Sequence, residues 1–194
     1  MSRRPRRDAQ RNRQLLLDAA AETFAVAGVG APLEAIADRA GVSIGTLYNH
    51  FVDRDHLVDA VISEALGRLT EVADHAAGID DPWDGLETLL VGTCQLQASD
   101  RAVADILGRS YPPTNIIDAA CAHLMDRFVE IIERGRRAGV VRDDFTIDDV
   151  GPIMWSNARL IEAGSTDNPG AWRRHLGFVL DGLRSGSGRH LACG

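Results

Sequence analysis

The sequence predicts an all-α protein of about nine helices, and three features of the chain support this prediction. Apolar residues recur every three or four positions through almost the whole chain, and no sustained alternation of β-branched residues indicates a strand. Glycines follow several of these amphipathic segments, where helices end, and Asp81-Pro82 has the residue types favoured where a helix begins. With 194 residues, 45% of them hydrophobic, the chain is long enough to bury a sizeable core.

Each expected helix has an apolar stripe on one face. The first, 9–27, aligns Leu16, Ala20 and Phe24, and two short helices at 33–40 and 44–50 follow it. The fourth begins after Asp53 and continues to about residue 77. Five further helices complete the chain, at 82–98, 100–109, 115–138, 147–163 and 169–184. This order predicts four regions: a basic flexible arm (1–8), a compact N-terminal domain (9–53), a larger helical domain (54–184) and a Gly/Ser-rich flexible tail (185–194).

The charge of the chain is distributed unevenly. The net charge is −7, and all 21 cations are arginines because the chain contains no lysine. Residues 1–13 carry six arginines against one aspartate, a net +5, whereas the other 181 residues sum to −12. An acidic chain by itself argues against a nucleic-acid partner, but a basic arm beside an acidic body is an asymmetry that favours one.

Several classes of protein are disfavoured because their sequence features are missing. No 18-residue apolar run is present, and Asp18 interrupts the leucines at 15–17, so we expect a cytoplasmic protein with no membrane partner. The three cysteines, Cys94, Cys121 and Cys193, form no CxxC pair, which indicates neither a disulfide framework nor a metal site. No phosphate-binding loop, nucleophile elbow or HExxH motif occurs, so we predict no enzyme, no catalytic residue and no cofactor.

Residues 32–51, PLEAIADRAGVSIGTLYNHF, have the pattern of a helix-turn-helix. Gly41 is suited to the left-handed turn between the two short helices, and Ser43 is suited to cap the second one. Leu47 and Phe51, four residues apart, would anchor the second helix from below. The outward side chains of this helix then carry hydrogen-bonding groups, as a DNA recognition helix requires: Thr46, Tyr48, Asn49 and His50.

These residues resemble the TetR family of bacterial transcriptional regulators. The resemblance runs over about 50 residues without a gap, through Ala19-Ala20, Phe24, Gly28, Ile36-Ala37, Ala40-Gly41-Val42-Ser43, Gly45-Thr46-Leu47-Tyr48, His50-Phe51, Asp53-Arg54 and Leu57. It implies a three-helix DNA-binding head on a larger body that binds a small ligand and dimerises. The family commonly has Thr before the second helix, and the Ala31-Pro32 of this chain lacks that hydroxyl, which puts one phosphate contact in doubt.

The resemblance also implies a DNA-contacting set. It comprises residues at the major groove and a phosphate contact at the start of the fourth helix: Ser43, Gly45, Thr46, Tyr48, Asn49, His50; and Arg54. The basic arm, with Arg4, Arg6 and Arg7, joins this set because it lies just before the head, where it would enter a minor groove or follow phosphates. For five of these features, a role without DNA contact remains open as an alternative. Tyr48 could pack at the head–body junction, His50 against the first helix, and Gly45 could serve close helix approach. Arg54 could pair with Asp55 or Glu64, and the arm could be a solvated tail.

For the body, the resemblance implies a ligand pocket among helices four to seven and a dimer interface on the last two. The candidate pocket residues, each of which could instead belong to the core, are Leu66, Leu90, Thr93, Gln97, Tyr111, Cys121, Met125, Phe128, Trp155 and Asn157. The candidate interface residues, open to the same alternative, are Ile153, Leu160, Ile161, Trp172, Leu176, Val179 and Leu183.

The predicted function is therefore a ligand-responsive repressor. It would bind a palindromic operator in double-stranded DNA as a homodimer and be released by a small, mainly apolar effector. Two alternatives remain open at this point: control by a protein partner, or control by oxidation of Cys94 and Cys121, which lie on adjacent expected helices.

Overall fold

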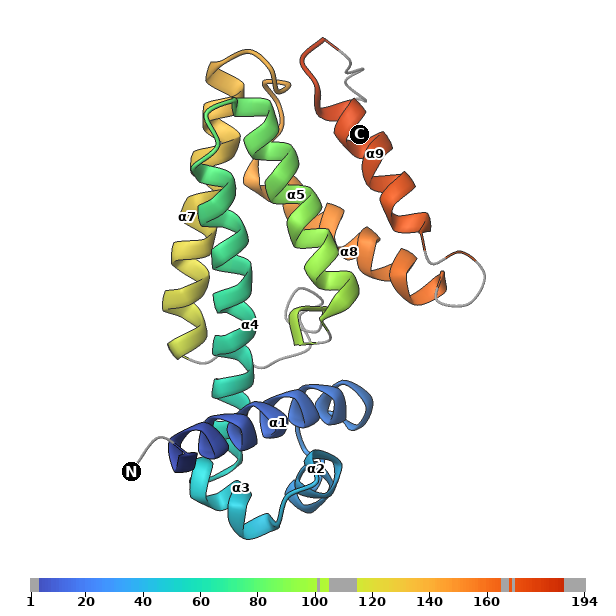
Figure 1. Ribbon diagram of the computed structural model, residues 1–194. Helices are drawn as coiled ribbons and strands as arrows, with labels where there is room; N and C mark the ends of the chain where they lie inside the picture. The colour runs from blue at the N-terminus through green and yellow to red at the C-terminus, as the bar shows by residue number, and fades with distance from the viewer. Residues whose placement is uncertain (1–3, 101, 105–114, 165–167, 169, 187–194) are drawn as a thin grey trace.

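The computed structural model describes residues 4–100, 102–104, 115–164, 168 and 170–186, and these residues form helices and no strand (Figure 1). The helices are α1 (Arg4–Ala27), α2 (Leu33–Ala40), α3 (Ile44–His50), α4 (Arg54–Ala77), α5 (Pro82–Ser99), α7 (Asn115–Arg137), α8 (Ile147–Ala163) and α9 (Ala171–Leu183). Of the expected helix at 100–109, only part lies within the described residues, and its residues 102–104 are helical. The all-α prediction is confirmed.

Both ends of the chain differ from the expected boundaries. Helix α1 begins at Arg4, so residues 4–8 are helical and the expected flexible arm at 1–8 is wrong over this part. Pro5 is favoured in a first helical turn, and the arginines that follow have good helix propensity. At the other end, the backbone N–H of Ser185 donates to the carbonyl of Val140 (3.0 Å), so the described start of the expected tail at 185–194 is held in place.

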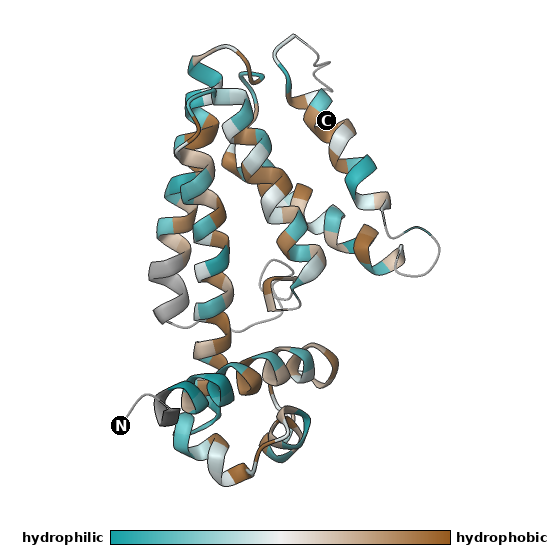
Figure 2. Ribbon diagram, viewed as in Figure 1, coloured by the Kyte–Doolittle hydropathy of each residue, from teal (hydrophilic) through white to brown (hydrophobic). Residues whose placement is uncertain are grey.

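Helices α1, α2 and α3 form a small head around their own apolar side chains. Leu16 and Ala20 of α1, Ile36 of α2 and Leu47 of α3 are fully buried, and Phe24 is nearly so. Burying each large side chain of this kind stabilises the folded state by about 1.5–3 kcal/mol. Figure 2 shows hydrophilic residues along the N-terminal half of α1, which extends beyond this core.

The body is built on α4, α5 and α7, which pack against one another along their lengths (Figure 1). Helices α4 and α7 run in the same direction and α5 runs in the opposite one, while α8 packs on α5 and α9 packs on α8. A Cβ at Gly92 of α5 would lie 2.7 Å from a methyl group of Val72, so glycine permits the close approach of α4 and α5. No helix in the described ranges is long and apolar enough to cross a membrane.

Candidate DNA interface and effector site

The turn between α2 and α3 has the predicted helix-turn-helix geometry. Gly41 has a φ of +68°, a left-handed conformation that side chains other than glycine rarely adopt. The Ser43 hydroxyl accepts a hydrogen bond from the Thr46 backbone N–H at 3.1 Å and so caps α3. At Pro32, the residue that caps α2, no side-chain hydrogen bond is present, which agrees with the missing hydroxyl at this position.

The outer face of α3 presents the residues that the sequence assigned to it. Tyr48 is 51% exposed and Asn49 is exposed, so the alternative that Tyr48 packs at the head–body junction is wrong. His50 is half-buried, with its ring 6.3 Å from that of Phe51, and Thr46 is half-buried with its hydroxyl 2.9 Å from that of Ser43. Capping hydrogen bonds and buried side chains fix both ends of the short helix α3. Tyr48 and Asn49 therefore project from a rigid support.

Gly45 is exposed on α3 and is not needed there for packing within the head. A Cβ added at this position would meet only the Ser43 hydroxyl, at an ordinary 3.8 Å. The alternative that Gly45 serves close helix approach therefore has no basis in the described contacts. A small residue on an exposed helix face instead leaves room for the close approach of another molecule.

The basic N-terminal half of α1 lies alongside α3. The guanidinium of Arg13 stacks 5.4 Å from the centre of the Phe51 ring, directly after α3, and the two helices are in contact. Arg7 and Arg11 are exposed, while Arg4 and Arg6 lie in the first turn of α1. The arginines therefore follow a helix that rises about 1.5 Å per residue rather than an extended arm.

Arg54 makes hydrogen bonds to the head that the sequence did not indicate. Its Nη1 donates to the backbone carbonyls of Val29, at 2.8 Å, and Ala31, both in the turn between α1 and α2. This nitrogen is therefore held by backbone carbonyls and not by Asp55 or Glu64, while the phosphate contact of Arg54 stays a prediction. The reason is that the α1–α2 turn leaves carbonyls without helical partners, and a half-buried guanidinium is well suited to satisfy them. Arg54 thus fastens the start of α4 to the head.

The start of α4 is also capped from its own side. The carboxylate of Asp53 accepts from the backbone N–H of His56 at 2.9 Å and lies 2.8 Å from Nδ1 of the same residue. These hydrogen bonds lower the pKa of Asp53, and the bond to the carboxylate raises the pKa of His56.

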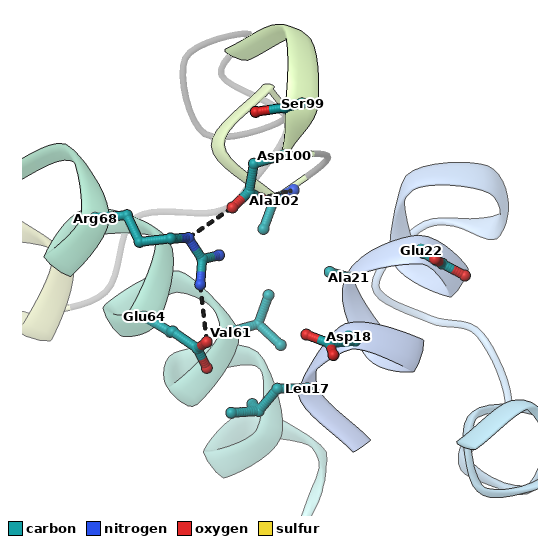
Figure 3. A pocket seen from close by; sticks show the side chains of 10 residues that line it. All are labelled: Leu17, Asp18, Ala21, Glu22, Val61, Glu64, Arg68, Ser99, Asp100 and Ala102. Atoms are coloured by element: carbon teal, nitrogen blue, oxygen red, sulfur yellow. Dashed lines mark hydrogen bonds and ion pairs between the residues drawn. The ribbon is translucent and has the colours of Figure 1, made fainter. Parts of the chain in front are cut away.

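A cleft of about 380 Å³ lies at the junction of head and body, and a series of polar side-chain contacts crosses it (Figure 3). Arg68 of α4 contacts Glu64 at 2.8 Å and Asp100, which follows α5, at 2.6 Å. The second oxygen of Asp100 accepts from the backbone N–H groups of residues 102 and 103. Glu64 in turn accepts a 2.7 Å hydrogen bond from Gln14 of α1. The segment after α5 is therefore linked to the head through α4.

Seven of the ten candidate pocket residues lie in the core, partly buried, at the surface or outside the described residues. Leu66, Leu90 and Phe128 are buried in the core shared by α4, α5 and α7, and Cys121 is half-buried. Met125 and Trp155 are 41% and 60% exposed on the surface of the protomer, so their placement in an interior pocket is wrong; the helical spacing alone could not tell an outer face from an inner one. Tyr111 lies outside the described residues.

The remaining three candidates, Thr93, Gln97 and Asn157, are all buried, and two of them, Gln97 and Asn157, are in contact. They are the polar side chains buried within the described part of the chain. Nδ2 of Asn157 donates to Oε1 of Gln97 at 2.7 Å, and Nε2 of Gln97 donates to the carbonyl of Met154 at 3.1 Å. Helices α5 and α8 are thus joined by a buried polar contact between residues sixty positions apart.

The structure gives little chemical support to oxidation at Cys94. Its sulfur is buried, 4.0 Å from the sulfur of Met154, and burial raises the pKa of the thiol to about 12. The thiolate is the form that reacts with oxidants and disulfides, so a thiol of this pKa reacts slowly at neutral pH. Cys193 lies outside the described residues.

The predicted dimer-interface residues are only partly available at the surface. Trp172, Leu176 and Leu183 are buried within the protomer, so they belong to its own core, because α9 packs this face onto the body. Four others are half-buried: Ile153, Leu160, Ile161 and Val179. Phe178, which is 62% exposed on α9, was not among the predicted interface residues.

Phe178 and Trp155 share a pattern that the sequence does contain. Each has an arginine four residues away on the same helix, and the guanidinium lies over the ring: Arg174 at 5.5 Å from Phe178 and Arg159 at 6.0 Å from Trp155. Large aromatic side chains beside arginines are enriched at protein interfaces.

Comparison with known proteins identifies the family. Residues 16–61 match the family of bacterial regulatory proteins called tetR, and residues 81–185, more than half of the chain, match the C-terminal domain of SbtR-like transcriptional regulators. The chain belongs to the TetR family. The predicted resemblance and the predicted fold are both confirmed.

Similar TetR-family proteins are regulators. The transcriptional repressor KstR2 of Rhodococcus jostii is 29% identical over 186 residues, which is 88% of this chain and 90% of that protein. The transcriptional regulator SrpR of Pseudomonas putida is 26% identical over 76% of this chain and 70% of its own length. A TetR regulatory protein from Mycobacterium vanbaalenii has a solved structure that is 29% identical, with a TM-score of 0.62 over 92% of this chain and 98% of the other. The chain is thus a helix-turn-helix transcription regulator, not an enzyme.

Proposed function

We propose that this TetR-family protein binds a palindromic DNA operator as a homodimer, represses transcription there, and is released by a small, mainly apolar effector. The observation that carries the proposal is the outer face of α3. There, Tyr48 and Asn49 are exposed on a short helix whose start is capped by Ser43 and whose far end is anchored by Phe51. Named repressors among the relatives, such as KstR2 of Rhodococcus jostii, support repression as the mode of action.

In DNA binding, α3 would contact the major groove and the basic half of α1 would contact phosphates. Asn49 and Tyr48 would contact base edges and phosphates in the major groove, and exposed Gly45 would let the DNA backbone approach α3 closely. The arginines from Arg4 to Arg13 would lie along phosphates beside α3. Because residues 14–60 carry a net −5, these arginines would supply most of the sequence-independent attraction to DNA.

A homodimer is proposed because one α3 helix reads too few base pairs for a specific site. Two protomers related by a twofold axis would place their α3 helices in successive major grooves, about 34 Å apart. The exposed aromatic residues Trp155 and Phe178, each covered on one side by an arginine, are the centre of the surface we assign to the second copy. Ile153, Leu160, Ile161 and Val179, which are half-buried, would add to it.

The effector would act through α4. Arg54 fastens the first turn of α4 to the α1–α2 turn, and the chain from Asp100 through Arg68 and Glu64 to Gln14 links the segment after α5 to the head. A shift of α4 or of this segment would therefore move α3 in each protomer. A changed separation of the two α3 helices lowers the affinity for a palindrome, with a coupling free energy on the order of 1–3 kcal/mol.

Selection of bound duplexes from random DNA, combined with sizing by light scattering, tests this proposal. We expect the selected DNA to contain an inverted repeat with half-site centres one or two helical turns apart, and the free protein to have the mass of two chains. Trp155→Ser with Phe178→Ser should shift the mass toward one chain and reduce operator binding together. Recovery of DNA without any repeat, bound by a single chain, would contradict the proposal.

A further inference from the structure

Two buried polar atoms between α5 and α8 have no hydrogen-bond partner within the described part of the chain: Oγ1 of Thr93 and Oδ1 of Asn157. Both side chains are only 1% exposed. Buried polar groups are nearly always hydrogen-bonded, because an unmade bond in the interior destabilises the fold. Two such atoms at one place therefore require an explanation.

The orientation of the amides follows from the network itself. The carbonyl of Met154 can only accept, so the Gln97 side chain must turn its NH₂ group toward it and its Oε1 toward Asn157. Asn157 must then use its NH₂ group for Gln97, which leaves Oδ1 as the unpaired acceptor. Flipping either amide would give this oxygen a partner only by leaving another polar atom without one.

Thr93 differs from comparable threonines of this chain. The hydroxyls of Thr23 and Thr70, in α1 and α4, each donate to the carbonyl four residues earlier, at 2.7 and 2.9 Å. This local bond is the usual way in which a helical threonine satisfies its hydroxyl. Thr93, the most buried of the three, has no such bond and keeps its hydroxyl free for another group.

The geometry points to Thr93 and Asn157 as the polar anchor for an apolar effector that carries a neutral hydroxyl group. Thr93 lies one turn before Gln97 on the same face of α5, and Gln97 contacts Asn157, so the two unpaired atoms belong to one cluster. A ligand hydroxyl both donates and accepts. It would donate to Oδ1 of Asn157 and accept from the Thr93 hydroxyl. This assignment rests on the proposed function and adds to it the chemical class of the effector.

The surroundings favour a neutral group over an ionised one. Apolar side chains next to the cluster are buried, including Leu89, Leu90, Cys94 and Met154, and within the described residues no charged side chain is buried. A carboxylate there would lose its hydration without gaining a cation, and it would face the acceptor oxygen of Asn157. The hydroxyl of an alcohol or phenol can hydrogen-bond to both unpaired atoms, and it carries no net charge.

Thermal denaturation of the full chain with matched pairs of small molecules tests the anchor. The probes are octanol against octane and naphthol against naphthalene, which differ within each pair by one hydroxyl. The variants are Thr93→Val, which keeps the volume and removes the unpaired hydroxyl, and Thr70→Val as the matched control. We expect wild type and Thr70→Val to bind the hydroxylated member at least about tenfold more tightly than its partner, and Thr93→Val to lose this preference.

The variant without any probe provides a second measurement. If the Thr93 hydroxyl is unpaired, Thr93→Val should melt at a higher temperature than wild type, whereas Thr70→Val should not. A lower melting temperature for Thr93→Val would mean that the hydroxyl is satisfied, for example by buried water, and would overturn the anchor. Equal shifts from octanol and octane, or a preference that Thr93→Val retains, would overturn it as well. Because these readouts need no DNA, they judge the anchor separately from operator binding.

Discussion

The head and the body of this protein place their proposed functional residues in opposite ways. In the head, Ser43, Tyr48 and Asn49 lie within seven residues of one another, and a single short helix presents them to solvent. In the body, Thr93 and Asn157 come from two helices, α5 and α8, that are far apart in the sequence, and both side chains are buried. The head therefore carries an exposed site that local sequence determines, and the body carries an interior site that only packing assembles.

The two proposed sites are connected through α4. A surface that reads DNA must be rigid, and a site that admits a ligand must let its helices move apart. Helix α4 belongs to both regions, since Arg54 holds the head and Arg68 contacts Asp100 beyond α5. The following variants separate the contributions of the two regions, beginning with the largest expected effect.

The outer face of α3 should dominate operator recognition. Tyr48→Ala combined with Asn49→Ala should reduce affinity for the selected operator by roughly 100-fold, since each base or phosphate contact contributes about 1–3 kcal/mol. Binding to unrelated DNA should change much less. Fluorescence anisotropy with both duplexes measures this, and Val26→Ala, at another exposed position of the head, serves as the control. Equal losses on both duplexes would mean that α3 does not read sequence.

The basic half of α1 should act on all DNA alike. Replacing Arg4, Arg6 and Arg7 with glutamine should weaken binding to operator and unrelated DNA by about tenfold each. The salt slope should fall by up to about 0.9 for each phosphate that the variant no longer neutralises. The titrations are repeated at several salt concentrations, with Arg137→Gln in the body as the control. An unchanged affinity and salt slope would leave these arginines as solvated side chains without a role in binding.

Arg54 should behave as a structural link between head and body. Arg54→Ala removes the bonds to the carbonyls of Val29 and Ala31, so we expect a loss of about 1–2 kcal/mol in the free energy of unfolding, reduced from the buried value because the side chain is half-buried. Operator affinity should fall without a change in salt slope. Stability comes from urea unfolding and the slope from anisotropy. A lower salt slope with unchanged stability would instead assign Arg54 to a phosphate.

Gly45 should show opposite effects on stability and on function. Gly45→Ala should stabilise α3 by up to about 1 kcal/mol, because alanine is the better helix former and its Cβ meets no close neighbour. The same methyl group should weaken operator binding several-fold by holding the DNA backbone away. Unfolding and anisotropy on the same preparation compare the two. An alanine variant that binds as well as wild type would remove close DNA approach as the reason for this glycine.

The parts of the fold that the sequence predicted are those determined by short-range chemistry. The left-handed turn at Gly41 and the cap at Ser43 depend only on neighbouring residues, and both were predicted correctly. The contact of Arg54 with the head was not predicted, because its partners are the backbone carbonyls of Val29 and Ala31, which no side-chain pattern indicates.

The body shows the same limit. Amphipathic spacing identified the helices but not which face each one buries, so Trp155 was expected inside and lies outside, while Trp172 was expected at an interface and lies in the core. Thr93, Gln97 and Asn157 were predicted as candidates by residue type, yet the network that joins them depends on how α5 and α8 pack.

We propose that two rigidly held α3 helices read two half-sites on one face of DNA. The most direct test is to titrate the wild-type chain against the selected palindrome and against the same half-sites separated by about five additional base pairs, half a helical turn. We expect two chains to bind the palindrome cooperatively and the insertion to lower affinity about 100-fold, because one half-site then faces away. Equal affinity for the two duplexes would mean that the two half-sites are not read together from one face.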